Sequence, residues 1–201
     1  MSRVVASKHE LKRQRDALAR YRRYLPTLRL KQQQLQVELR RVDRAVQEVS
    51  DEEARVRREL GEWIDLWAEG QALDAFLTIE EVRIGETSVA GVSVPTLEGV
   101  TYLRRPPPLE ATPSWVDDAL PVLERLVEAR LRRRVLAEGR SRLADELRLT
   151  SQRVNLFENV KIPAAEEALR TIRIALGDLQ AAEVVRAKIA KAKSMERERA
   201  V

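Results

Sequence analysis

Apolar residues recur every seven positions through the first third of the chain, in two rows. The first row is Val4, Leu11, Leu18, Leu25, Gln32, Leu39, Val46, Glu53, Leu60 and Trp67. The second row is Tyr21, Leu28, Leu35, Val42, Val49, Val56 and Trp63. Two rows with this period are the a and d positions of a coiled coil. A single helix over residues 4–67 would extend about 95 Å at about 1.5 Å per residue, which is longer than any element a compact domain of this size needs.

A second ladder occupies the C-terminal part of the chain. Its members are Leu126, Ala129, Leu136, Leu143, Leu147, Thr150, Val154 and Phe157, then, after one extra residue, Ile162, Ala165, Leu169, Ile172, Leu176 and Leu179. The extra residue lies beside Pro163, where a helix loses a backbone hydrogen bond and can bend. Arg133 and Arg140 occupy expected seam positions, which predicts looser packing there. Two seams of similar length in one chain predict an intramolecular antiparallel hairpin.

The segment between the ladders has a different composition. Residues 77–103 are rich in β-branched residues and partly alternate with period two, which predicts two or three short strands, with a turn at Gly85-Glu86-Thr87-Ser88. Pro106-Pro107-Pro108 predicts an extended connector, and Ser114 has the position of a helix N-cap. The seam continues in phase across Pro26, which predicts a kink there and not an end; Pro121 predicts a bend or a short first segment of the second helix.

The expected fold class is therefore mainly α, a long antiparallel two-helix coiled coil (a helical hairpin) with a small central β-hairpin insert. The expected domains are an N-terminal coiled-coil helix over 1–70, a central insert with the β-hairpin and the Pro-rich connector over 71–113, and a C-terminal coiled-coil helix over 114–201. Charged residues make up 34% of the chain and aromatic residues 4%, as expected for long helices with a narrow core. Cysteine is absent, and no run of about 18 apolar residues occurs, which favours an intracellular protein without a transmembrane segment.

Charge is distributed unevenly along the chain. Residues 1–31 hold ten Lys or Arg against two acidic residues, and residues 186–201 hold six against two. Because the whole chain has a net charge of only +5, the segment between them is acidic. An antiparallel hairpin would place both termini at one end, so a basic tip and an acidic remainder are expected to face different partners.

Residue patterns typical of catalysis or cofactor binding are missing. His9 is the single histidine, which without cysteine makes neither a conventional zinc site nor a catalytic triad, and we expect it on a solvated helix surface. No phosphate-binding glycine motif occurs. The run Arg130 to Arg134, with Arg140 and Arg142, is interpreted as a solvated face balanced by acids of the partner helix; phosphate or nucleic-acid binding is the alternative. We expect Trp63 and Trp67 to pack in the core, and we expect no enzymatic activity and no cofactor.

Three stretches resemble the D subunit of V-type (vacuolar/archaeal-type) rotary ATPases, in its bacterial branch. The signature T-S-x-x-V-N-A-L-E followed by I-P is matched by Thr150, Ser151, Val154, Asn155, Glu158, Ile162 and Pro163. Leu156-Phe157 stands where the family has Ala-Leu. The segments 25–35 (L-P-T-L-R-L-K-Q-Q-Q-L) and 89–95 (V-A-G-V-S-V-P) are similar to two further family segments, and all three occur in the family's order.

The resemblance implies a rotor shaft that carries torque between an ATP-binding ring of A and B subunits and the ion-translocating ring in the membrane. The implied partners are the A and B subunits, the F subunit and the protein that caps the membrane ring, at a cytoplasmic location peripheral to the membrane. Charge suggests that the basic tip contacts the A/B ring, through Arg3, Lys8, Lys12, Arg13, Arg15, Lys188, Lys191, Lys193, Arg197 and Arg199. The competing interpretation is a free coiled-coil scaffold, or a rod that binds nucleic acid through the same tip.

Overall fold

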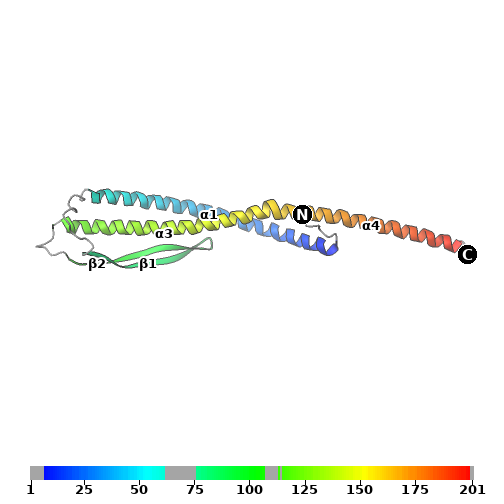
Figure 1. Ribbon diagram of the computed structural model, residues 1–201, viewed down its shortest axis with the longest axis horizontal. Helices are drawn as coiled ribbons and strands as arrows, with labels where there is room; N and C mark the ends of the chain where they lie inside the picture. Colours follow the sequence, from blue (N-terminus) through cyan, green and yellow to red (C-terminus); the bar gives the residue numbers. More distant parts are fainter. Residues whose placement is uncertain (1–6, 62–75, 107–112, 114, 200–201) are drawn as a thin grey trace. The chain divides into compact units, whose positions relative to one another are not determined.

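The computed structural model describes residues 7–61, 76–106, 113 and 115–199, with side chains described as far as residue 195. The elements are helix α1 (Lys8–Gly61), strands β1 (Leu77–Val89) and β2 (Val92–Arg104), helix α3 (Trp115–Leu156), the π-helical turn η2 (Phe157–Lys161) and helix α4 (Ile162–Arg199). Figure 1 shows these elements along the chain. They divide into two compact units, Met1–Leu30 with Thr150–Val201, and Lys31–Leu149. The described chain is mostly helical, with one two-stranded antiparallel sheet inserted between helices.

Burial along α1 confirms the heptad register. Every described member of the two rows is buried or half-buried, with Leu35 fully buried and Val56 only 1% exposed. Apolar residues outside the rows, such as Tyr24 and Leu30, are instead more than half exposed. Val4, Trp63 and Trp67 lie outside the described residues, as do the predicted helix end near residue 70 and the Ser114 cap. Helix α1 continues through Pro26 and α3 through Pro121, so neither proline ends a helix.

The second ladder is also confirmed as far as Leu176, but the expected last member is wrong. Leu179 is 55% exposed, whereas Leu169 and Ile172 are buried. In the unit that contains both terminal segments, Arg22 of α1 pairs with Glu166 of α4. Counting outward in antiparallel register puts the first turn of α1 at the level of Leu179, so within the described residues α1 has no turn beyond that level to cover it.

The extra residue in the second ladder forms the π-helical turn η2. The backbone N–H of Ile162 donates to the carbonyl oxygen of Phe157, five residues earlier. A π-bulge accommodates one inserted residue in a helix without breaking it. Pro163 has no N–H to donate and follows directly, so the wider turn lies where the α-helical bonding pattern would be interrupted in any case. The sequence predicted this one-residue slip, and η2 returns Ile162 and Ala165 to the seam.

The two strands form one long hairpin, and the predicted turn is wrong. Gly85-Glu86-Thr87-Ser88 lies inside β1, where these residues pair with Thr96, Pro95, Val94 and Ser93. The chain reverses at Ala90 and Gly91, whose φ angles of 50° and 78° are those of a two-residue hairpin turn. Gly85 instead gives space to the Glu98 side chain, which lies where a Cβ at this position would be. The expected two or three short strands are therefore two strands of 13 residues each.

The hairpin packs on the helices of its own unit. In that unit, Leu35 of α1, Val94 of β2 and Leu143 of α3 form one buried cluster, with Val89 and Ala90 packed against it. Two further clusters, one of Val56, Leu60 and Val122 and one of Leu77, Val116 and Leu120, continue the core along α3. Figure 1 shows the hairpin lying alongside α3. Apolar residues from all three segments therefore meet in the first cluster, whereas the second joins α1 to α3 and the third joins the hairpin to α3.

Gly139 of α3 allows the hairpin to approach closely. A Cβ built at Gly139 would lie 2.6 Å from Cγ1 of Val94, whereas one built at Gly177 of α4 meets nothing within 4 Å. Alanine normally stabilises a helix interior by about 1 kcal/mol relative to glycine. We expect Gly177→Ala to stabilise the protein by about that amount and Gly139→Ala to destabilise it, because Val94 has a stiff, buried side chain. Chemical denaturation measures both, and a gain of stability in Gly139→Ala would contradict the close packing.

Candidate partner-binding surface

Ion pairs cross between the antiparallel helices in each unit. In the unit with both terminal segments, Arg22 pairs with Glu166 at 2.6 Å and Arg29 with Glu158 at 2.5 Å. In the other unit the cross-helix pairs are Lys31–Glu146, Asp43–Arg140, Glu53–Arg130, Glu53–Arg133 and Glu59–Arg125. Most of these side chains are about half exposed, so each pair contributes little to stability. The order of these charges along the helices still distinguishes an antiparallel from a parallel alignment.

The sign of the charge on α1 reverses along its length. The α1 residues that form cross-helix pairs are cationic up to Lys31 and anionic from Asp43 onward. The partner residues in α3 and α4 have the opposite order, with Arg125 to Arg140 first and Glu146 to Glu166 later. A parallel alignment of the two ladders would place like charges opposite one another, which is destabilising. The charge pattern therefore favours the antiparallel pairing in addition to the apolar seam.

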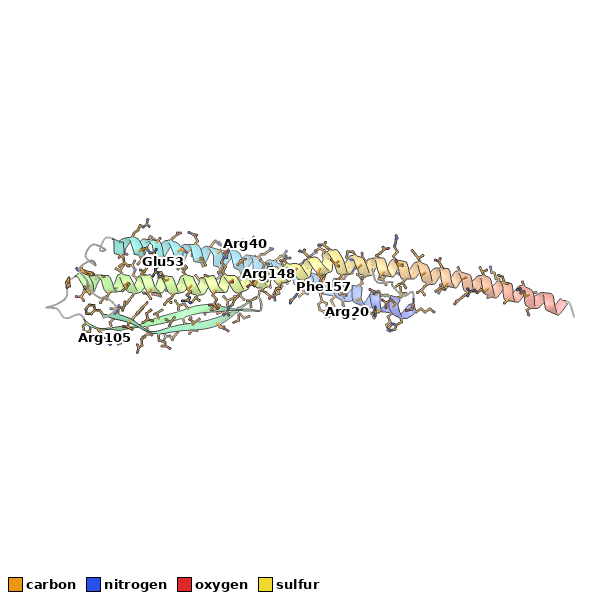
Figure 2. All side chains as sticks on the ribbon, in the orientation of Figure 1. Arg20, Arg40, Glu53, Arg105, Arg148 and Phe157 are labelled. Atoms are coloured by element: carbon orange, nitrogen blue, oxygen red, sulfur yellow. The ribbon has the colours of Figure 1, made fainter. Side chains whose placement is uncertain are left out.

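Glu53 is a buried carboxylate at a seam position, held by three arginines. Its side chain is 6% exposed and accepts hydrogen bonds from Arg57 Nη2 and Arg130 Nε, both at 3.1 Å. Arg133 Nε forms an ion pair with the same carboxylate at 3.0 Å. Figure 2 labels Glu53, and the two contacts from α3 place its carboxylate at the α1–α3 interface. A buried carboxylate requires such partners, because desolvation without them is costly. Arg133 and Arg140 thus form cross-helix ion pairs at the seam positions where looser packing was expected.

Polar contacts fasten both ends of the hairpin to α3. Arg104 donates to both carboxylate oxygens of Glu124 at 2.6 Å, and the Tyr102 hydroxyl donates to the Glu124 carbonyl at 3.2 Å. Burial raises the pKa of Tyr102, and the charges of Glu128 and Glu124 act in the same direction.

Near the turn, Arg142 donates to the Ser93 carbonyl at 3.2 Å and lies 3.5 Å from Glu86. A hydrogen bond from Ser93 chiefly lowers the pKa of Glu86, aided by Arg142 and opposed by desolvation. These contacts position β2 along α3 in addition to the apolar core.

The candidate contact residues of the basic tip belong to one unit, but those of α1 and those of α4 lie at different heights along the helix pair. Lys8, Lys12, Arg13 and Arg15 are exposed on the first turns of α1, and Lys188, Lys191 and Lys193 are exposed on α4. Arg13 pairs with Glu10 at 3.0 Å. Arg3 lies outside the described residues; Arg197 and Arg199 lie in α4, and their side chains are not described. By the Arg22–Glu166 register, Lys188 lies about 12 Å beyond the level of Lys8, at about 1.5 Å per residue.

The family-motif residues have mainly structural positions. Thr150 is fully buried, Val154 is 5% exposed, and Ser151 and Ile162 are half-buried. Glu158 pairs with Arg29, beside the contact between the rings of Tyr21 and Phe157, whose centroids are 5.3 Å apart. Asn155 and Pro163 are exposed. The motif thus surrounds η2 and its packing on α1, and Phe157, the larger residue at its position, contacts an aromatic side chain there.

Sequence reasoning missed the grouping of arginines around Glu53. The signal was present: Glu53 occupies an a position of the first ladder, and Arg133 fills a gap in the second. Setting the ladders antiparallel would have placed these two residues opposite each other. His9 is exposed on α1, as expected. Among the residues that the structure describes, no group of acidic, histidine or cysteine side chains is arranged to hold a metal ion, and no helix is long and apolar enough to cross a membrane.

Known proteins similar to this chain share one family description. A family model described as the D subunit of ATP synthase matches residues 10–192. The D subunit of the V-type ATP synthase of Borreliella burgdorferi is 35% identical over 199 residues, which span 99% of this chain and 98% of that protein. Proteins of the same name from Chlamydia abortus and Chlamydia caviae are 32% and 30% identical over 199 residues, in each case 98% of this chain and 96% of the relative.

Proposed function

This chain belongs to the family of V-type ATP synthase D subunits, and from that premise we propose that it is the central-stalk shaft of a rotary ATPase. In this role it transmits torque between the ATP-binding A/B ring and the ion-translocating ring in the membrane. It performs no chemistry itself and works peripheral to the membrane, on the cytoplasmic side. The observation that carries this proposal is an antiparallel helix pair with a heptad seam and cross-helix ion pairs in both units.

A shaft must prevent its two helices from sliding or rotating past each other. Interdigitated seam side chains resist both motions, because each one fills a space between residues of the facing helix. In the unit of residues 31–149, Leu35 and Leu143 are fully buried in this way. Glu53 also fixes the register of the two helices, since its carboxylate contacts guanidiniums three residues apart on α3, those of Arg130 and Arg133. Torque applied to one helix is then shared by the other.

A shaft must also turn within its surroundings without adhering to them. The exposed faces of α1 and α3 carry long charged side chains, many of them in ion pairs within one helix, such as Arg41–Glu38 of α1 and Arg148–Asp145 of α3. Charged surfaces of mixed sign do not form the extended apolar patches that promote stable association. Near the chain ends, by contrast, basic residues outnumber acidic ones. We propose that the exposed lysines there contact the A/B ring.

The test replaces four exposed lysines, Lys8, Lys12, Lys191 and Lys193, with glutamine. We expect weaker assembly with the A/B ring, and a larger defect at about 0.05 M than at about 0.5 M salt, because salt screens exposed charges. Binding of the F subunit is expected to survive, because we place that contact on the acidic remainder of the chain. Size-exclusion chromatography of the purified proteins measures both.

The matched control replaces four exposed arginines of the other unit, Arg40, Arg55, Arg58 and Arg83, with glutamine. It removes the same charge, so a general effect of net charge would reduce ring assembly equally in both variants. If the lysine variant instead lost the F subunit while assembling normally with the ring, the proposed orientation would be wrong. Circular dichroism should show equal helicity in all three proteins, since none of the eight residues is buried.

A further inference from the structure

A groove of about 560 Å³ lies beside Glu53, between α1 and α3 in the unit of residues 31–149. Its lining residues are Val46, Ser50, Arg130, Leu131, Arg133, Arg134 and Ala137. Three of these are arginines from successive turns of α3, and no acidic side chain lines the groove. Val46, Leu131 and Ala137 make the lining partly apolar.

The arginine run separates into two groups on the two sides of α3. Arg132 and Arg142 lie on the side of the hairpin and pair with Glu128 and Glu138. Arg130 and Arg133, on the groove side, share the single carboxylate of Glu53 with Arg57. Arg134 has no ion pair or hydrogen bond within the described part of the chain. Three guanidiniums therefore contact one carboxylate, and Arg134 adds a fourth cation on the groove side, so positive charge is in excess among these residues.

The geometry of the shared contacts leaves donors available. Arg130 and Arg133 each reach Glu53 through Nε, and a guanidinium has donors on its two terminal nitrogens as well. One carboxylate accepts about four hydrogen bonds, fewer than three guanidiniums offer. Glu53 is buried, so it fixes these two arginines in position on the groove side. The terminal nitrogens of Arg130 and Arg133 are thus preorganised donors beside an accessible groove, and the Arg134 guanidinium adds a third cation to its lining.

We propose that this groove binds a phosphate-class oxyanion through Arg130, Arg133 and Arg134. Planar guanidinium forks match phosphate oxygens in bidentate geometry, and each such bond is charge-assisted. The anion supplies the negative charge that Glu53 alone does not provide. Free phosphate and the phosphates of a nucleotide share this chemistry. Because the donors converge only when Glu53 of α1 meets α3, the anion binds the paired helices and stabilises them.

The experiment measures thermal melting and calorimetric binding of the full chain with inorganic phosphate, at constant ionic strength set with chloride. Phosphate is expected to raise the melting temperature saturably, beyond the effect of chloride. Arg134→Gln should weaken phosphate binding about tenfold, the effect of losing a charged hydrogen-bonding partner, and leave the melting temperature without phosphate unchanged. The matched control, Arg132→Gln, removes the same charge from the other side of the same turn and should bind phosphate as the unaltered chain does.

Titration with ADP, without magnesium, distinguishes the two sources of phosphate. Tighter binding of ADP than of phosphate, lost in Arg134→Gln, would assign the groove to a nucleotide phosphate; equal binding, also lost, would assign it to free phosphate. The proposal is overturned if phosphate and chloride stabilise the chain equally, or if Arg132→Gln weakens binding as much as Arg134→Gln. These outcomes do not depend on assembly with the A/B ring, so they are independent of the proposed shaft function.

Discussion

Leu35→Asp is expected to cost at least about 4 kcal/mol of unfolding free energy, because it removes a buried leucine and places a carboxylate in an apolar core. Leu35 is fully buried against Val94 and Leu143, so the change disrupts both the packing of α1 on α3 and the packing of the hairpin on these helices. Typical domains are stable by only about 5–15 kcal/mol, so this loss would remove a large share of the free energy of unfolding. Urea denaturation followed by circular dichroism measures the difference.

The control for this variant is Arg44→Asp on the same helix. Arg44 is exposed, and its side chain donates a 3.4 Å hydrogen bond to the Arg40 carbonyl in the same helix. Substitutions at such positions usually change stability by less than about 1 kcal/mol. Equal losses in Leu35→Asp and Arg44→Asp would show that the seam does not have the register described.

Glu53→Gln is expected to destabilise the helix pair by about 2–3 kcal/mol. The substitution keeps the shape of the side chain but removes the charge that Arg57, Arg130 and Arg133 share, and leaves like charges close together. Each of these arginines is half exposed or more, so water moderates the cost. Denaturation of the variant at low salt measures the effect, which added salt should reduce.

A comparison pair separates this buried cluster from ordinary ion pairs. Glu59→Gln removes a carboxylate that is 43% exposed and pairs with Arg125, and should cost less than about 1 kcal/mol. The double variant Glu53→Leu with Arg133→Leu restores an apolar seam and should lie within about 1 kcal/mol of the unaltered chain, or above it. If Glu53→Gln cost no more than Glu59→Gln, the cluster would not contribute as described.

Local periodicity in the sequence predicted much of this architecture. An a and d ladder constrains which face of a helix is apolar, whatever it packs against, and Leu35 and Val56 lie where the ladder placed them. The one-residue slip before Ile162 likewise required a local irregularity, which is the turn η2. These features depend on residues close together in the chain.

Features that depend on contacts distant in sequence were decided by the tertiary structure. Gly85 and Gly91 are both plausible turn residues, and the choice rests on Val89, Ala90, Val92 and Val94 packing against α1 and α3. Gly139 is needed only because Val94 of the hairpin packs against its Cα, where a Cβ would collide with it. A carboxylate at the seam position of Glu53 is unfavourable in α1 alone, because its burial requires the charges of Arg130 and Arg133 from α3. The sequence by itself determined the helices and their apolar faces. Only the tertiary structure decided the position of the hairpin turn, the approach of Val94 to Gly139 and the burial of the Glu53 carboxylate. The interactions that stabilise these three features form only between residues distant in the chain.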